Sequence, residues 1–316
     1  METILLAFVV PAVAVVLDSL FGDPQTFPYP VRYIGKGLDL FETFIRKTQI
    51  NLWIAGWIAM LLFSMIALGI AEFLMSIPYL GIFFAIYLAY AGLALGCLIK
   101  ESRQVVAVLD RGNLVEARKA LSMLVSRDTT ALDANEIRRT LAETISENLN
   151  DGFVAPMFYL SIFGPGGLWV YKTVSTMDSM WGYKTERFKN LGHAAAKTDD
   201  VLAYIPARLT AWLLLLVGKK HGLLYREAKA NFVTDAVKME SPNAGWPMAA
   251  TAWLFDGQMG GKTVYFGQTK DKPVLGPIGK EWSDSMIHSL LQISNSVGHY
   301  AAAVFILALG WIQIAF

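Results

Sequence analysis

Four polar residues that could bind a cation stand directly before a long apolar run: Glu143, Glu147, Asn148 and Asp151. Successive residues of a helix are rotated by about 100°, so Glu143 and Glu147 lie one turn apart on the same face. Carboxylates this close repel each other unless a cation or a basic group lies between them. Oxygen ligands of this kind suit Mg²⁺, which also binds substrate phosphates. The other interpretation is a solvated acidic face, which the adjoining apolar run disfavours.

Two further acidic groups have spacings that suit a metal–phosphate site. Asp178 is followed closely by the basic residues Lys184 and Arg187, and a surface turn with helix-end charges is the alternative. Asp199 and Asp200 open an apolar helix, where they either cap its first turn or provide a second pair of magnesium ligands.

Three short motifs are candidates for anion binding. Arg127 stands in "SRDTT", where a helix terminus is the simpler interpretation. Ser241 and Asn243 stand in "SPNAGWP", before an apolar helix whose first N–H groups could bind an anion; a structural turn fits equally well. The motif "DGQMGGKT", residues 256–263, lacks the first glycine of a phosphate-binding loop, so a P-loop is excluded. Its glycines still allow a ligand close to the backbone.

Composition indicates the class of protein that must position these residues. The chain has 316 residues, of which 54% are hydrophobic and 17% charged, whereas soluble domains carry about 25% charged residues. This indicates an integral membrane protein. The net charge of +1 gives no overall attraction for nucleic acid. One cysteine, Cys97, excludes a disulfide framework, and four scattered histidines exclude a zinc site.

Hydropathy predicts an all-α polytopic membrane protein with one membrane-embedded domain, residues 1–316. Spanning segments need about 20 apolar residues, and the candidates are 3–20, 52–75, 78–99 and 297–316. Two apolar stretches, 153–171 and 204–217, are interrupted by Gly164 and Pro165 and by Arg208, respectively. We expect both to be re-entrant or interfacial, because broken backbone at membrane depth must be shielded. If each crossed once, residues 172–203 would instead be external.

The distribution of Lys and Arg predicts the orientation. Basic residues are frequent in 22–51 and 100–150 and absent between the second and third candidate spans, which places the first two regions in the cytoplasm. Region 100–150 is predicted to be helical, with caps at Asn113 and Asp133. "KTVYFG", residues 262–267, has the clearest strand pattern.

Taken in order, these segments resemble the adenosylcobinamide-phosphate synthase family of cobalamin biosynthesis. The resemblance runs from "LDSLFGDPQTFPYPVRYIG" through "SRDTT", "ETISENLNDGFVAPMFY", "YKTVSTMDSMWGYKTERF" and "AKTDDVLAYIPARL" to "SPNAGWP" and "VYFGQTKDKPVLG". Each piece is weak alone, but the ordered set is specific. The chain departs from the family pattern at Tyr29, where a histidine is usual, and at Ser175, where an asparagine is usual. No role is therefore assigned to these two positions.

The resemblance implies a multi-pass enzyme of the cell membrane whose active site faces the cytoplasm. The family joins adenosylcobyric acid to an amino-alcohol phosphate such as (R)-1-aminopropan-2-ol O-phosphate, with ATP as co-substrate and Mg²⁺ as cofactor. The partners implied are these substrates and the lipid bilayer. A homo-oligomer and an association with other membrane enzymes of cobalamin assembly are both open. The alternatives in other classes are a corrinoid-binding or transporting protein and a related non-catalytic sensor.

The resemblance implies roles for the candidate residues. We expect catalytic roles for Glu143, Glu147, Asp151 and Asp178, with Glu143 as the base that deprotonates the substrate ammonium. The expected magnesium ligands are Glu147, Asp151, Asp178, Asp199 and Asp200. The expected substrate and phosphate partners are Arg32, Arg127, Asn148, Lys184, Arg208, Ser241 and Asn243.

Overall fold

The computed structural model of the chain describes residues 5–23, 28–265 and 268–315. These residues are nearly all helical or in short connections, and the one sheet among them has two strands. Four segments within this part of the chain are long and apolar enough to cross a membrane. The predicted all-α polytopic membrane protein is therefore confirmed.

The backbone divides into two compact units, each assembled from segments that are distant in the sequence. Unit 1 comprises Met1–Ala94, Ala155–Ala203 and Ala302–Phe316, and unit 2 comprises Leu95–Val154 and Tyr204–Ala301. The chain passes from one unit to the other several times, so neither unit is encoded by one contiguous stretch. The single domain expected from the sequence stays a prediction.

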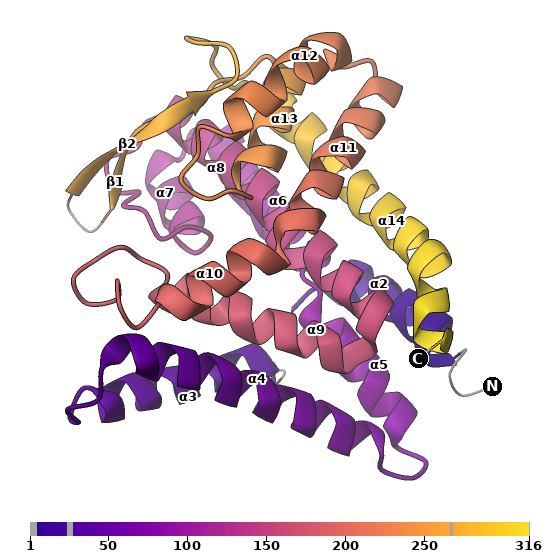
Figure 1. Cartoon of the computed structure of the whole chain (residues 1–316). Coiled ribbons are helices and arrows are strands. Elements are labelled where there is room, and N and C mark those ends of the chain that lie inside the picture. The colour runs from indigo at the N-terminus through magenta and orange to yellow at the C-terminus, as the bar shows by residue number, and fades with distance from the viewer. Residues whose placement is uncertain (1–4, 24–27, 266–267, 316) are drawn as a thin grey trace. The chain divides into compact units, whose positions relative to one another are not determined.

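Unit 1 is a set of apolar helices. Its elements are the π-helix η1 (Leu5–Val9), α2 (Val10–Phe21), α3 (Pro30–Ile45), α4 (Leu52–Met75), α5 (Gly81–Gly92), α9 (Ala155–Trp181), α10 (His193–Leu202) and the C-terminal part of α14 (Asp284–Ala315). Helix α4 packs against α9, α10 and α3, and Figure 1 shows α3 and α4 side by side. Leu38, Trp181 and Leu191 are buried in the core that these helices enclose.

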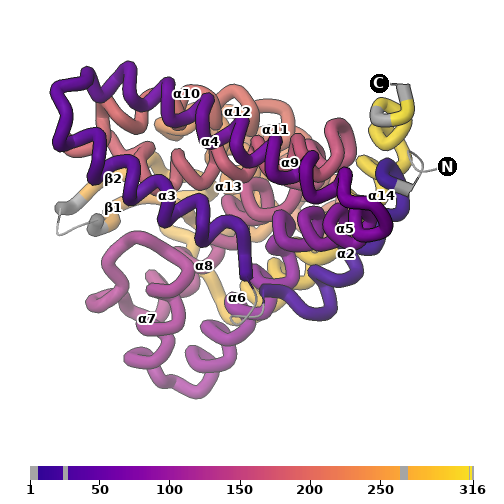
Figure 2. The backbone as a smooth tube through the Cα atoms, turned by 90° about the horizontal axis from the view of Figure 1, so that it is seen from below, coloured from indigo at the N-terminus to yellow at the C-terminus, as the bar shows by residue number. Residues whose placement is uncertain are grey.

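Unit 2 combines helices, some of them rich in charged residues, with the β-hairpin. Its elements are α6 (Leu95–Asp110), α7 (Leu114–Ser122), α8 (Ala134–Leu149), the π-helix η2 (Asn150–Val154), α11 (Tyr204–Lys220), α12 (Tyr225–Ala236), α13 (Gly245–Phe255), β1 (Met259–Tyr265), β2 (Gln268–Leu275) and the N-terminal part of α14. Helix α13 packs on α11 and α12, and β1 packs on α8. Figure 2 shows α7 beside α6, with which it is in contact.

The spanning segments differ in part from those predicted. The four that are long and apolar enough are Leu52–Met75, Gly81–Asp110, Ala134–Trp181 and Asp284–Ile312. The first agrees with the prediction, and the second and fourth contain most of the predicted 78–99 and 297–316. Residue 316 lies outside the described residues.

The span expected at 3–20 stays a prediction. Residues 3 and 4 lie outside the described residues, and the apolar helix in this region is shorter, Leu6–Phe21. It falls short of the roughly 20 residues that a span requires.

The stretch 153–171 belongs to a segment that is long enough to span the membrane. Because α8 carries five charged residues, the apolar part of Ala134–Trp181 lies in α9.

The interruptions seen in the sequence are present in the structure. Helix α9 breaks at Gly164, whose backbone has φ 66° and ψ −167°, immediately before Pro165. A positive φ is accessible to glycine at little cost, and proline cannot donate to the preceding turn. Helices His193–Leu202 and Tyr204–Lys220 are long and apolar enough for a span only when they are taken together. The re-entrant placement of both stretches stays a prediction.

The local helix signals of region 100–150 are confirmed. Asn113 caps α7 by accepting a hydrogen bond from the backbone N–H of Glu116 at 3.1 Å. Asp133 and Glu136 form a reciprocal capping box at the start of α8. Each cap satisfies N–H groups that the first turn of a helix leaves without partners.

Candidate functional site

The centre of unit 2 is a buried ion pair between Arg127 and Glu143. Arg127 is 9% exposed and Glu143 1% exposed. A guanidinium N–H of Arg127 donates to Oε2 of Glu143, and a second donates to the Thr140 hydroxyl at 3.2 Å. The other carboxylate oxygen of Glu143 accepts the backbone N–H of Gly260 at 2.8 Å. Glu143 therefore joins the loop before α8 to the hairpin after α13.

An irregularity in the hairpin makes this last contact available. The antiparallel register of β1 and β2 shifts between Met259 and Gly261, so Gly260 lies in a bulge. Its φ is 78°, and a Cβ there would lie 2.0 Å from the carbonyl oxygen of Pro273. Only glycine fits both conditions. The bulge directs the Gly260 N–H to Glu143 instead of to the opposite strand.

The remaining acidic residues of the opening motif lie at the end of α8. Glu147 is half-buried and interacts electrostatically with Glu143, Arg127 and Lys272. The expectation that Glu143 and Glu147 share a face is confirmed by this interaction. Lys272, on β2, is a basic group near these carboxylates that the sequence analysis did not identify.

A π-helix follows these carboxylates directly. In η2, Asn150 donates to Asp151 at 2.7 Å and accepts the Thr210 hydroxyl at 2.9 Å. The amide of Asn148 donates to the carbonyl oxygen of Thr144 within α8. Single π-turns inside helices occur frequently at functional sites. Here the wider turn positions Asp151 beside Asn150.

Arg208 is held between two aromatic rings. Its guanidinium carbon lies 3.5 Å from the ring centroid of Tyr204 and 4.5 Å from that of Trp246. Nη1 donates to the carbonyl oxygen of Tyr204 at 2.9 Å and to Oδ1 of Asn243 at 2.8 Å. Among the described residues, Nε and Nη2 of Arg208 make no hydrogen bond. The group is thus a fixed planar cation with donors to spare.

The motif that contains Ser241 forms a turn. The Ser241 hydroxyl accepts the backbone N–H groups of Asn243 and Ala244, each at 3.3 Å, just before α13. The side chain of Asn243 is buried against Arg208. The structural interpretation of "SPNAGWP" therefore holds for Ser241, while Asn243 helps to orient Arg208.

The other predicted site residues belong to unit 1. Asp178 is half-buried near the end of α9, and Lys184 is exposed in the connection that follows. Asp200 pairs with Lys197 at 3.4 Å, and both lie on α10 with Asp199. Arg32 lies 5.7 Å from the ring centroid of Tyr29.

Unit 1 also contains a charged cluster that the sequence analysis missed. Glu42 is 4% exposed and accepts hydrogen bonds from Arg46 at 2.7 Å and from both ends of the Arg187 guanidinium at 2.9 and 3.0 Å. Burial raises the pKa of Glu42, but the hydrogen bonds and charges of the two arginines outweigh it, and the net pKa is lowered. The spacing of four residues between Glu42 and Arg46 is the one feature of the sequence that could have predicted this cluster.

The carboxylates fit Mg²⁺ only when a substrate supplies the remaining ligands. Among the described residues, no three His, Cys, Asp or Glu side chains gather closely enough to enclose a metal ion. Mg²⁺ is commonly held by one or two carboxylates and completes its shell with water and phosphate oxygens. Glu147 and Asp151, one turn apart, suit that mode in unit 2. The metal roles of all five predicted ligands stay predictions.

A family model and several known proteins are similar to this chain over most of its length. The model of a family described as CobD/Cbib protein matches residues 11–294. A protein of Clostridium perfringens named "Cobalamin biosynthesis protein CobD" is 37% identical over 92% of this chain and 94% of its own length. Two proteins of the same name are also similar. The protein of Geobacter metallireducens is 40% identical over 83% of this chain and 84% of its own length. The protein of Klebsiella pneumoniae is 33% identical over 95% of this chain and 97% of its own length. No solved structure matches the chain.

Proposed function

The chain belongs to the CobD/Cbib protein family, and on that premise we propose that it acts in cobalamin biosynthesis as an ATP-dependent ligase. The reaction would join the free carboxylate of adenosylcobyric acid to an amino-alcohol phosphate, such as (R)-1-aminopropan-2-ol O-phosphate. The product would be adenosylcobinamide phosphate. The match over residues 11–294 includes every predicted site residue, which supports the assignment.

The observation that carries the proposal is the fixed guanidinium of Arg208. A planar cation with two donors to spare suits bidentate recognition of a phosphate or a carboxylate. The stacking rings of Tyr204 and Trp246 keep the guanidinium in one plane. Each of the proposed substrates carries a carboxylate or a phosphate group, and an oriented cation is suited to position such a group.

The proposed chemistry proceeds in two steps. ATP phosphorylates the carboxylate, which gives an acyl phosphate and ADP. The amine then attacks the acyl carbon, the amide bond forms, phosphate leaves, and the ammonium proton passes to a base. Mg²⁺ bound with ATP would neutralise phosphate charge, and Glu147 and Asp151 would hold it in unit 2. Positioning and charge neutralisation are the main contributions of the protein in such reactions.

The contacts of Glu143 bear on its expected role as the base. Its two carboxylate oxygens are bound by the Arg127 guanidinium and by the Gly260 N–H. Such contacts stabilise a carboxylate that anchors a structure, and they compete with proton transfer. We therefore propose that Glu143 anchors the structure rather than serving as the base. Glu147, which makes no hydrogen bond with the described residues, stays a proposed magnesium ligand.

We propose that the reaction takes place at the cytoplasmic side of the cell membrane. The concentration of Lys and Arg in residues 22–51 and 100–150 supports this orientation. ATP is available on that side.

A pair of matched variants tests the assignment. Glu147→Gln removes the carboxylate from the site, and Glu227→Gln removes an exposed carboxylate from α12. Each purified protein is incubated with adenosylcobyric acid, ATP, Mg²⁺ and the amino-alcohol phosphate, and the corrinoid product is quantified by mass. We expect the first variant to lose product formation and the second to keep it. Equal activity in both variants would remove Glu147 from the site.

A further inference from the structure

A small cavity of about 250 Å³ lies beside α8 in unit 2. Its walls come from the first turns of α8, from Gln258 just before β1, and from the segment 279–282 that leads into α14. None of the residues that line it belongs to the site predicted from the sequence. Pockets for drug-sized ligands measure about 300–1,000 Å³, so this cavity suits a smaller molecule.

Two basic residues, Arg139 and Lys280, line the cavity. The guanidinium of Arg139 makes one long contact, from Nη2 to the carbonyl oxygen of Lys262 at 3.5 Å. Its Nε is buried and has no hydrogen-bond partner among the described residues. Lys280 pairs with Asp256 at 3.0 Å, and both side chains are exposed, so this pair is weak. These two cations therefore remain able to bind a phosphate, for which a guanidinium fork is well suited.

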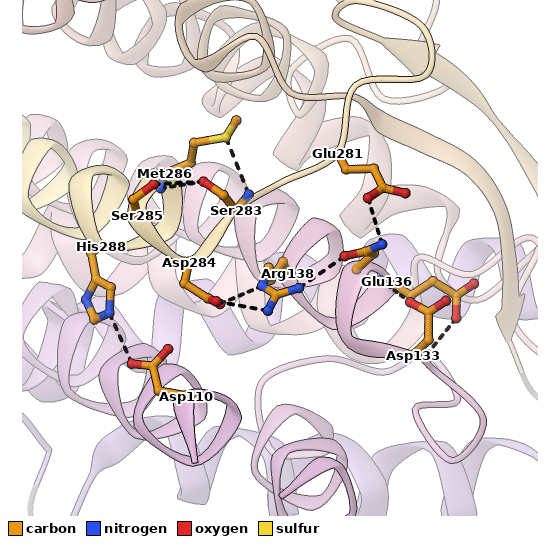
Figure 3. A network of polar contacts seen from close by, with 11 residues as sticks. Asp110, Asp133, Glu136, Arg138, Glu281, Ser283, Asp284, Ser285, Met286 and His288 are labelled. Carbon is orange, nitrogen blue, oxygen red and sulfur yellow. Dashed lines mark hydrogen bonds and ion pairs between the residues drawn. The ribbon is translucent and has the colours of Figure 1, made fainter. Parts of the chain in front are cut away.

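Acidic residues also line the cavity, among them Glu136 and Glu281, and a network of hydrogen bonds holds Glu281 in place. Arg138 binds both carboxylate oxygens of Asp284, at 2.5 and 3.0 Å, and donates to Asn135 at 3.1 Å. Asn135 in turn donates to Glu281 at 2.8 Å. Figure 3 shows this chain of contacts from Asp284 through Arg138 to Glu281. A carboxylate that is already oriented loses less conformational entropy when it binds a ligand.

Gln258 fixes the segment that carries Lys280 and Glu281. Its backbone N–H donates to the carbonyl oxygen of Lys280 at 2.8 Å, and its side-chain oxygen accepts the N–H of Gly279 at 2.7 Å. The buried indole of Trp282 donates to the carbonyl oxygen of Gln258 at 2.9 Å. The cavity thus has fixed walls, and residues of both charges and the indole of Trp282 line it.

We propose that this cavity binds the small substrate of the ligase, a zwitterion that carries one ammonium group and one phosphate monoester. The phosphate lies against Arg139 and Lys280, and the ammonium lies against Glu281 and Glu136. The volume excludes a corrin, and the acidic residues of the lining disfavour the triphosphate of a nucleotide. This inference rests on the proposed function and names the place where one of its substrates binds.

Calorimetric titration of the full-length protein in detergent tests the site without ATP or corrinoid. The probes are O-phosphoethanolamine, ethanolamine and inorganic phosphate. We expect O-phosphoethanolamine to bind about tenfold or more tightly than ethanolamine or inorganic phosphate, because only the zwitterion engages both the basic and the acidic residues of the cavity. Arg139→Gln and Glu281→Gln should each weaken its binding about tenfold, whereas Arg111→Gln, an exposed control in the same unit, should not. Glu281 is exposed, so its substitution leaves the fold intact.

Kinetics separate this inference from the proposed reaction. Arg139→Gln should raise KM for the amino-alcohol phosphate and leave KM for ATP and for the corrinoid unchanged. Binding of O-phosphoethanolamine that depends on Arg139 and Glu281, in a protein that forms no amide, would support the cavity and refute the ligase. Amide formation with an unchanged KM in both variants, or no binding of the zwitterion to the wild type, would overturn the cavity as its site.

Discussion

Replacement of Glu143 by Gln should lower the free energy of unfolding of the protein, independently of any effect on the reaction. The substitution keeps the size of the side chain but removes the charge that faces Arg127, which is 9% exposed. Removing one partner of a buried ion pair typically costs about 3–5 kcal/mol, because the other charge stays buried. The loss of the charged acceptor for the Gly260 N–H is included in this range. We expect a decrease of this size in the free energy of unfolding.

A double-mutant cycle measures the pair directly. Arg127→Met and Glu143→Met should each cost about 3–5 kcal/mol, whereas the double variant should cost clearly less than either alone, because apolar replacements of buried pairs are often neutral. Unfolding by denaturant is followed by tryptophan fluorescence in detergent. The exposed pair of Glu186 and Lys189 serves as the control, and its loss should cost under about 1 kcal/mol. The buried pair would be refuted if Glu143→Gln lowered the free energy of unfolding by under about 1 kcal/mol, as the control does, and if the effects of the two Met substitutions simply added in the double variant.

Three further predictions test other parts of the structure. Because the pKa of Glu42 is lowered in the fold, its contribution to stability is complete above the ordinary value of about 4.3 and is lost as pH falls; unfolding free energies measured from pH 7 to 3 should therefore decline more in the wild type than in Glu42→Gln. Gly260→Ala should cost about 1–3 kcal/mol more than Gly112→Ala, because both have a positive φ but only the first meets backbone, at Pro273; equal unfolding free energies would contradict the bulge. Arg208→Lys should lower kcat/KM for amide formation about tenfold, because an ammonium lacks the planar fork; unchanged kinetics would remove Arg208 from the site.

Features encoded within a few residues could be predicted from the sequence. The caps at Asn113 and Asp133 depend on a side chain and an N–H three residues later, and both are present. The break at Gly164 follows from the conformational preferences of glycine and proline. The span expected at 3–20 stays a prediction, because residues 3 and 4 lie outside the described residues and the apolar helix described there is Leu6–Phe21.

The partners of the site residues could not be predicted in this way. Glu143 accepts the N–H of Gly260 because a bulge in the hairpin turns that N–H away from the opposite strand. The two residues are 117 positions apart, and no local sequence pattern links them. Tyr204 and Arg208 are one helical turn apart and could have been paired, but Trp246 comes from another helix. Such contacts depend on tertiary packing, which a single sequence does not reveal.

The mass of the corrinoid after a complete reaction tests the central claim most directly. The purified protein is incubated with ATP, Mg²⁺, (R)-1-aminopropan-2-ol O-phosphate and adenosylcobyric acid labelled with ¹⁸O in its free carboxylate. We expect a corrinoid heavier by the amine less one water, together with ADP and phosphate that carries one ¹⁸O atom. An unchanged corrinoid mass with every substrate present would contradict it and would favour a protein that binds corrinoids without chemistry.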